Sequence, residues 1–392
     1  MIAIKNGKTV TPDRVVENKT LLFDRDGIFG FSDSRERAED AACVVDARGR
    51  YILPGLIDVH SDKIEQYIKP RPTSQMDFEF ALKVCERDLL GAGITTMYHS
   101  LSLYKDEIFG RCVLKSRENV QKIADLTAEL HLRNHLIRHR LHLRIELDNP
   151  EIFDTVRDLI RGGKTHLISF MDHTPGQGQY TDLGVYRDTV SKYNGKEIRT
   201  LGFDGVLAYH KNKEFLSLAK RKELAELAHE KGIAVASHDD DTEEKLALNR
   251  VIGVDVSEFP VSLEAAKSAK SQGFHTVVGA ANILRGGSHS GNLSAAEAVL
   301  EDCADIICSD YYPAAILHSI FHMHESYGVP LPQMVNRATL NPAKAMGTDK
   351  DYGSVEPGKK ADLLIVDILD GYPVITDVFV DGHATYRVEY RS

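Results

Sequence analysis

Hydrophobic and polar positions follow different patterns at the ends and in the middle of the chain. Residues 1–52 are short apolar runs separated by turn signals such as Asn6-Gly7 and Asp26-Gly27, which is typical of β-hairpins. The C-terminal segment repeats this pattern in ADLLIVDI, YPVITDVFVDGH and ATYRVEY. We therefore predict a small β-sandwich domain built from both chain ends, residues 1–52 plus 346–392.

The middle of the chain, residues 53–345, alternates strand-like apolar runs with helical stretches such as 117–137 and 213–232. This alternation is typical of a parallel α/β fold. The strand candidates are GLIDVHSD, GITTMYHS, LHLRIELD, THLISFMDH, GIAVASHDD, GVDVSEFP, HTVVGAANIL and ADIICSDYY. This set predicts a (β/α)8 barrel whose chemistry lies at the carboxyl ends of the strands. An open doubly wound sheet is the alternative, but no GxGxxG turn follows the first strand.

Polar side chains occupy one face of several of these strands. In the third strand, His142, Arg144, Glu146 and Asp148 alternate with apolar residues. In the first strand, period-two alternation places Asp58, His60 and Asp62 on one face. Each polar group that points into a barrel interior costs several kcal/mol of folding free energy unless it is paired or binds a metal. The alternative for the third strand is an exposed edge strand with a solvated face.

The ends of three further strands add candidate metal ligands. His173 follows the fourth strand beside Asp172, and alternation directs only one of the two inward. His238 stands on the same face as two small alanines, and Asp310 closes the eighth strand. Histidine, Asp and Glu suit zinc and similar divalent ions, and two such ions need about six protein ligands. The predicted ligands are His60, Asp62, Glu146, His173, His238 and Asp310.

Two segments are candidates for binding an anion. The loop after the seventh strand contains Arg285, Gly286, Gly287, Ser288 and His289, and consecutive backbone N–H groups in such a loop form an anion nest. The loop after strand seven of such barrels often holds phosphate. Lys63 and Arg71 follow the first strand in KIEQYIKPRP. A flexible surface loop is the alternative for both segments.

Composition limits the remaining classes of function. The net charge is −10 and the pI is about 5.9, which argues against general binding to nucleic acid or to an anionic membrane. The five Cys are odd in number and scattered, which is typical of reduced intracellular thiols. The N-terminal residues show no signal-peptide pattern, and no apolar run is long enough to span a membrane. We expect a cytoplasmic enzyme.

Several motifs resemble a known family. LPGLIDVHSD, NPAKAMG and GSVEPGKKADLLIVD are similar to the amidohydrolase superfamily. Within it, HSDKIEQYIKPRP, MDHTPGQGQ, SHDD, RGGSHSGN and SDYYP resemble the amidohydrolases of the carbon–phosphorus lyase pathway of phosphonate catabolism. The resemblance extends over essentially the whole chain, and it implies a metal-dependent barrel flanked by a small β domain.

The resemblance also implies an activity. It is the hydrolysis of an acid anhydride, which converts ribose 1-methylphosphonate 5-triphosphate to the 5-phosphate and pyrophosphate. Asp310 would accept a proton from the attacking water as well as bind metal, Glu146 would bridge two divalent ions, and Arg285 with its loop would hold phosphate or phosphonate oxygens. Zinc is the first expectation, with manganese or iron as alternatives. The ligand would be a small polyphosphorylated sugar phosphonate, and a homo-oligomer is left open.

The chain departs from the wider superfamily at three positions, and two rival functions are also considered. Asp62 replaces the second His of the usual His-x-His, no Lys ends the fourth strand, and the sixth strand offers Glu258 in place of His. The first rival is an amidohydrolase that acts on a cyclic amide or deaminates a base. The second is a metal-free scaffold protein, which the retained ligand set disfavours.

Overall fold

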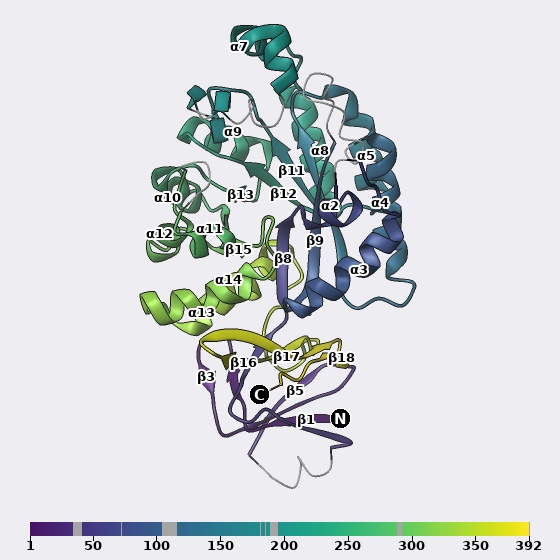
Figure 1. The fold of residues 1–392 in the computed structure, drawn as a ribbon, viewed down its shortest axis with the longest axis vertical. Helices are drawn as coiled ribbons and strands as arrows, with labels where there is room; N and C mark the ends of the chain where they lie inside the picture. Colours follow the sequence, from purple (N-terminus) through teal and green to yellow (C-terminus); the bar gives the residue numbers. More distant parts are fainter. Residues whose placement is uncertain are drawn as a thin grey trace.

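The structure, a computed structural model, describes residues 1–33, 41–71, 73–103, 116–180, 182–184, 186–188, 195–287 and 292–391. A barrel occupies the upper and middle part of Figure 1, and two smaller sheets lie below it. The purple N-terminal strands and the yellow C-terminal strands lie together in this lower part.

Both chain ends contribute to the smaller sheets. Their strand orders are β5-β4-β1-β6 and β18-β17-β16-β7-β2-β3. The rings of Phe23 and Phe379 meet edge to face at 5.2 Å between the two sheets, in a shared apolar core. The strands are β1 (Ile2–Lys5), β2 (Lys8–Val10), β3 (Val15–Val16), β4 (Thr20–Phe23), β5 (Ile28–Ser32), β6 (Cys43–Asp46), β7 (Tyr51–Pro54), β16 (Leu363–Leu369), β17 (Tyr372–Val380) and β18 (His383–Arg387). A sandwich assembled from both ends is therefore confirmed, whereas the boundaries 1–52, 53–345 and 346–392 stay a prediction.

Eight parallel strands form the barrel, in the order of the sequence. They are β8 (Leu56–Ser61), β9 (Ile94–Leu103), β10 (Arg138–Glu146), β11 (Leu167–Met171), β12 (Ala234–His238), β13 (Val256–Glu258), β14 (His275–Gly279) and β15 (Ile306–Cys308). Each predicted strand overlaps one of them, and β9 and β10 extend beyond the predicted stretches. A single bridge between Ser61 and Asp310 joins the first strand to the last. The (β/α)8 prediction is confirmed.

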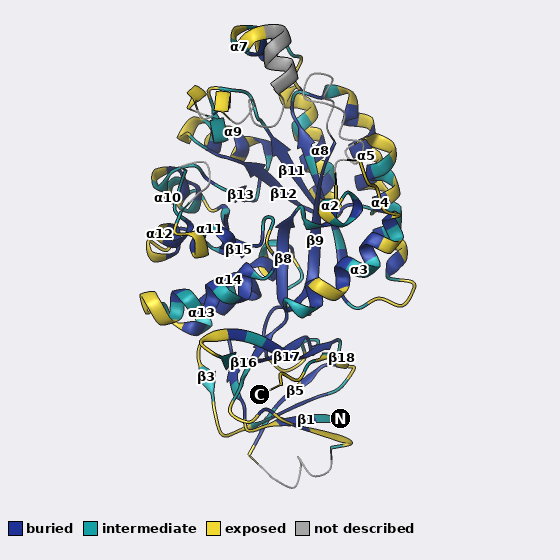
Figure 2. Cartoon of the chain, in the orientation of Figure 1, coloured by how far each residue is buried: buried dark blue, intermediate teal, exposed yellow. Residues whose placement is uncertain are grey.

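Helices cover the outside of the barrel, and in Figure 2 their outward faces are exposed while the strands are buried. Leu141, Leu143 and Ile145 of β10 belong to the apolar core that also contains Ile123 of α4, which confirms the predicted faces of this strand. The helices are α2 (Lys63–Ile68), α3 (Phe78–Gly91), α4 (Arg117–Leu130), α5 (Phe153–Arg161), α7 (Gly195–Lys211), α8 (Leu218–Glu230), α9 (Glu243–Ile252), α10 (Leu263–Ser271), α11 (Ala280–Arg285), α12 (Ala295–Leu300), α13 (Ala315–Tyr327), α14 (Leu331–Ala338) and α15 (Leu340–Ala345), with short 3-10 turns at Pro150–Ile152 and Gly178–Tyr180. Of the helices described, none combines the length and apolarity that crossing a membrane requires.

The first barrel strand differs from its sequence prediction. Pairing of β8 with β9 shifts register between Asp58 and Ser61, so side chains do not alternate strictly there. Ile57 and Val59 pack in an apolar cluster with residues of β12 to β15. The Asp58 carboxylate instead accepts the N–H of Ser309 at 3.0 Å, across the closing seam. The prediction that Asp58 shares a face with His60 and Asp62 is wrong, because the irregular register breaks the period of two.

Candidate metal centre

A pocket of about 460 Å³ lies at the carboxyl ends of the barrel strands. Five of the six ligands predicted from the sequence line it. They are His60, Asp62, His173, His238 and Asp310. Arg144, Asp239, Phe259, Gly279, Asn282 and Asn292 are among the other residues of its wall.

The closing seam of the barrel brings residues from the first and last strands together. The N–H of Asp310 donates to the carbonyl of His60 at 3.0 Å, and the N–H of Asp62 donates to the carbonyl of Asp310 at 3.0 Å. These reciprocal bonds hold the backbone of the three residues in one place. Burial, followed by the negative charge of Asp62, raises the pKa of Asp310 to about 6.

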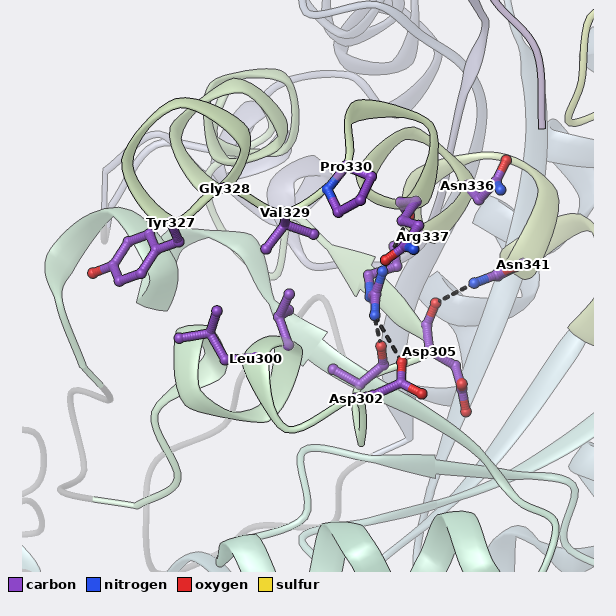
Figure 3. A pocket seen from close by; sticks show the side chains of 13 residues that line it. Leu300, Asp302, Asp305, Tyr327, Gly328, Val329, Pro330, Asn336, Arg337 and Asn341 are labelled. Atoms are coloured by element: carbon purple, nitrogen blue, oxygen red, sulfur yellow. Dashed lines mark hydrogen bonds and ion pairs between the residues drawn. The ribbon is translucent and has the colours of Figure 1, made fainter. Parts of the chain in front are cut away.

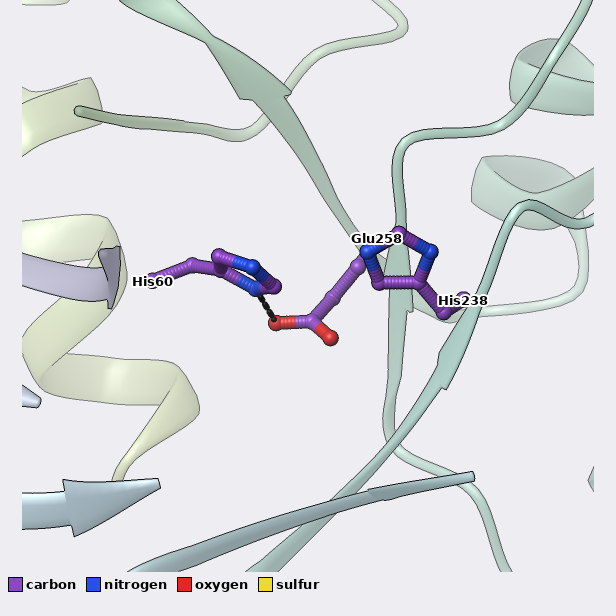
Figure 4. Close-up of side chains that lie close together, drawn as sticks. All are labelled: His60, His238 and Glu258. Atoms are coloured by element: carbon purple, nitrogen blue, oxygen red, sulfur yellow. Dashed lines mark hydrogen bonds and ion pairs between the residues drawn. The ribbon is translucent and has the colours of Figure 1, made fainter. Parts of the chain in front are cut away.

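One group of candidate metal ligands consists of His60, His238 and Glu258. Their ligand atoms lie within 4.8 Å of one another, and all three residues are buried (Figure 4). Nδ1 of His60 lies 2.9 Å from Oε1 of Glu258, and His238 is the register partner of Glu258 on the neighbouring strand. The three side chains thus converge from the carboxyl ends of β8, β12 and β13.

A second group consists of His173, His238 and Asp239, again with ligand atoms within 4.8 Å of one another. His238 belongs to both groups, and its Nδ1 lies 2.8 Å from Oδ2 of Asp239. Nδ1 of His173 donates to Oε2 of Glu146 at 2.9 Å, which leaves Nε2 of that ring to bind a metal ion. Glu146 contacts His173 but does not line the pocket. The bridging role predicted for it stays a prediction.

Backbone strain collects around this pocket. Asp239, Phe259 and Asp310 have φ angles of 52°, 52° and 61°, in the left-handed region that residues other than glycine rarely adopt. Each follows the end of a barrel strand, and each lines the pocket. Such strain persists only where the surrounding structure enforces it, and it concentrates at functional sites.

The electrostatics of the pocket favour a bound cation. Burial, followed by the positive charges of Arg144 and His238, holds the pKa of His60 well below its usual range, so the imidazole keeps a free lone pair at neutral pH. Burial raises the pKa of Asp239, but the nearby His238 and His173 lower it by more, so the carboxyl stays ionised. Neutral imidazole and ionised carboxylate are the forms that ligate a divalent metal.

An unsatisfied atom supports the same interpretation. Oε2 of Glu258 is buried and accepts no hydrogen bond, and its nearest partner is Nε2 of His142 at 3.8 Å. A buried carboxylate oxygen without a partner costs free energy unless a cation compensates it. The donor set and this atom therefore fit a divalent ion held between β8, β12 and β13.

The residues predicted to bind anions lie farther out. Within the described part of the chain, Lys63, Arg71 and Arg285 lie outside the pocket wall, and Arg71 and Arg285 are exposed. Gly286 and Gly287 continue from α11 with positive φ, and Ser288 and His289 fall outside the described residues. Asn282 and Asn292, which lie on either side of this segment in the sequence, both line the pocket.

Sequence reasoning missed three residues of the site. Glu258 and Asp239 complete the two ligand groups, and Arg144 lines the pocket. Glu258 lies two residues after Val256, so period-two alternation places both on the inner face of β13. This pattern indicated an inward carboxylate, but Glu258 was not included among the predicted ligands because a His is usual at that position. Asp239 had no such signal, because only its left-handed backbone turns it toward the pocket.

Comparisons with known proteins identify the family of the chain. The family model described as the amidohydrolase family matches residues 197–385. Alpha-D-ribose 1-methylphosphonate 5-triphosphate diphosphatase of Escherichia coli strain K12 is 32% identical over 391 residues, which cover 98% of this chain and 100% of that protein.

Solved structures share the fold at lower identity. The crystal structure of a Xaa-Pro dipeptidase with bound methionine has a TM-score of 0.67 at 15% identity, covering 99% of this chain and 100% of the other. That of N-acetylglucosamine-6-phosphate deacetylase from Pasteurella multocida has a TM-score of 0.65 at 14% identity, covering 98% and 99%. With the full-length match to the diphosphatase, these findings lead to one conclusion: the chain belongs to the amidohydrolase family.

Proposed function

We propose that this protein hydrolyses ribose 1-methylphosphonate 5-triphosphate to the 5-phosphate and pyrophosphate in phosphonate catabolism. The observation that carries the proposal is the full-length similarity to the Escherichia coli diphosphatase. The pocket supports it, since it holds a ligand set for divalent ions and is lined by Asn282, three residues before Arg285. A cytoplasmic location stays a prediction.

His60, His238 and Glu258 would hold one divalent ion, and His173, His238 and Asp239 would hold or help to hold a second. Asp62 and Asp310 reach the same pocket and extend the oxygen donor set. Imidazole and carboxylate ligands without Cys suit zinc, with manganese or iron as alternatives. Bound there, such ions would lower the pKa of a water molecule and offset negative charge on phosphoryl oxygens.

The protein residues supply the rest of the chemistry. Asp310 would take the proton of the attacking water while the water oxygen bonds to phosphorus and the anhydride bond between the α and β phosphates breaks. With attack at the α phosphorus, pyrophosphate leaves with the electron pair of that bond; with attack at the β phosphorus, the sugar 5-phosphate leaves with it and the water oxygen becomes part of pyrophosphate. Arg285 and the glycines that follow it would hold outer oxygens of the substrate at the pocket mouth.

The direct test offers the purified, metal-loaded protein three substrates in parallel: the ribose phosphonate triphosphate, ATP and dihydroorotate. We expect pyrophosphate from the first and no ring opening of the third. If neither triphosphate releases pyrophosphate, the proposal fails, and ring opening alone would favour the cyclic amide rival.

Replacement of Arg285 by alanine is expected to raise KM for the triphosphate about tenfold or more, because a hydrogen bond to a charged group contributes about 1.5–3 kcal/mol. A small change in kcat is expected, since the residue lies outside the pocket wall that holds the ligand groups. Steady-state kinetics measure both constants. An unchanged KM would remove Arg285 from the binding site and favour a cyclic amide substrate.

Replacement of Glu146 by glutamine is expected to lower metal affinity about 10- to 100-fold, because the carboxylate orients His173 through its Nδ1. Titration of metal-depleted protein with zinc measures the affinity. Glu151→Gln on the exposed surface is a matched control that should bind zinc normally. An affinity equal to that of the wild type would exclude both the orienting role and the bridging role.

A further inference from the structure

Arg144 is a half-buried arginine, and it differs from Arg138 and Arg337, the two arginines that are fully buried in the described part of the chain. It stands on β10, two positions before Glu146, and lines the pocket beside the ligand groups. Its Nε is buried without a hydrogen-bond partner, and no ion pair joins its guanidinium to any other residue in the described part of the chain. A buried donor that stays unsatisfied costs about 1–3 kcal/mol.

The two buried arginines are each paired. Arg221 also has a buried Nε without a hydrogen-bond partner, but it does not line the pocket. Arg337 borders a separate cavity between α12 and α14, where it donates to the carbonyls of Ala304 and Gln333 and pairs with Asp302 (Figure 3). Arg138, at the start of β10, pairs with two aspartates near the small sheets. Arg144 therefore has the features of a group that is arranged for a ligand.

The surroundings identify the chemistry of that ligand. The positive charge of Arg144 acts on both His60 and Asp310, since it lowers the pKa of each. Arg144 thus lines the same pocket as the candidate metal ligands and the candidate base. A planar guanidinium presents two parallel donors that match two oxygens of a phosphate, and it carries a charge at every relevant pH.

We propose that Arg144 binds the phosphoryl group under attack and stabilises the negative charge that builds on its non-bridging oxygens. This inference rests on the proposed function. The two arginines would then have different roles. Arg144, which lines the pocket, would bind the reacting phosphoryl group, and the exposed Arg285 would bind outer groups of the substrate.

The test compares Arg144→Gln and Arg144→Lys with the wild type and with Arg133→Gln, a control on an exposed arginine that pairs with Glu79 and Glu129. Three quantities are measured: kcat and KM for the triphosphate, affinity for inorganic pyrophosphate by calorimetry, and bound metal. Arg144→Gln should lower kcat about 10²- to 10³-fold, as loss of one transition-state donor does elsewhere. It should weaken pyrophosphate binding about 10- to 100-fold.

The lysine variant separates charge from geometry. It should recover part of the pyrophosphate affinity but little of kcat, because an ammonium group cannot form the paired bonds of a guanidinium. Metal content at the wild-type level in both variants excludes an indirect effect through the ligands. The control should behave as the wild type.

Three results would overturn the inference or the function on which it rests. Wild-type kcat and pyrophosphate affinity in Arg144→Gln would overturn the role of Arg144 alone. So would a variant that lacks metal and regains full activity once metal is added back. Failure of the wild type to release pyrophosphate would overturn the proposed function, and the calorimetry would still decide whether Arg144 binds a phosphate anion.

Discussion

Replacement of His238 by asparagine is expected to remove bound metal and to lower pyrophosphate release by about three orders of magnitude or more. The ring belongs to both ligand groups, with His60 and Glu258 on one side and His173 and Asp239 on the other. Losing it therefore weakens two sites at once, and bound metals contribute several kcal/mol to such a reaction. Elemental analysis of the purified protein and a pyrophosphate assay measure the two effects.

The matched control for this variant is His383→Asn, which changes an exposed histidine of β18. It should keep the metal content and rate of the wild type. A His238 variant that retains full metal content and activity would show that the two ligand groups are not the metal centre.

Replacement of Asp310 by asparagine is expected to lower kcat about 10²- to 10⁴-fold, the range for loss of a general base. The carboxyl has its pKa raised to about 6, first by burial and then by Asp62. A base works only when deprotonated, so the wild-type rate falls as the pH falls through that pKa. Cations bound nearby would move this limb to lower pH. The asparagine variant should lack the limb.

Rates measured between pH 5 and 8 on metal-loaded protein test this expectation. Asp351→Asn, at an exposed position, is the control and should keep the wild-type profile. If the Asp310 variant loses metal and activity in the same proportion, its role is ligation and the base lies elsewhere.

The sequence predicted the barrel because its strands carry strong local signals. Leu141, Leu143 and Ile145 must face the helices, and that requirement alone directs His142 and Arg144 inward. A period-two pattern of this kind depends on no distant contact. The same argument located His60, His173, His238 and Asp310 at the ends of the strands that line the pocket.

The remaining residues depended on contacts that local patterns do not contain. The partnership of Glu258 with His60 requires β13 and β8 to converge across the closed barrel. Asp239 reaches the pocket through a left-handed backbone conformation, which residue type does not reveal. Asp58 was misplaced because the register of β8 shifts, and that shift arises from pairing with β9.

The seam between β8 and β15 has a consequence for the folding of the enzyme. Asp58 and Ser309, which meet there, are 251 positions apart in the sequence, so we expect this contact to close after assembly of the strands between them, which shortens the loop that remains to be closed. His60, Asp62 and Asp310 come together at that step. A nascent or partly folded chain would therefore lack a reactive centre, and a metal bound there stabilises only the completed fold.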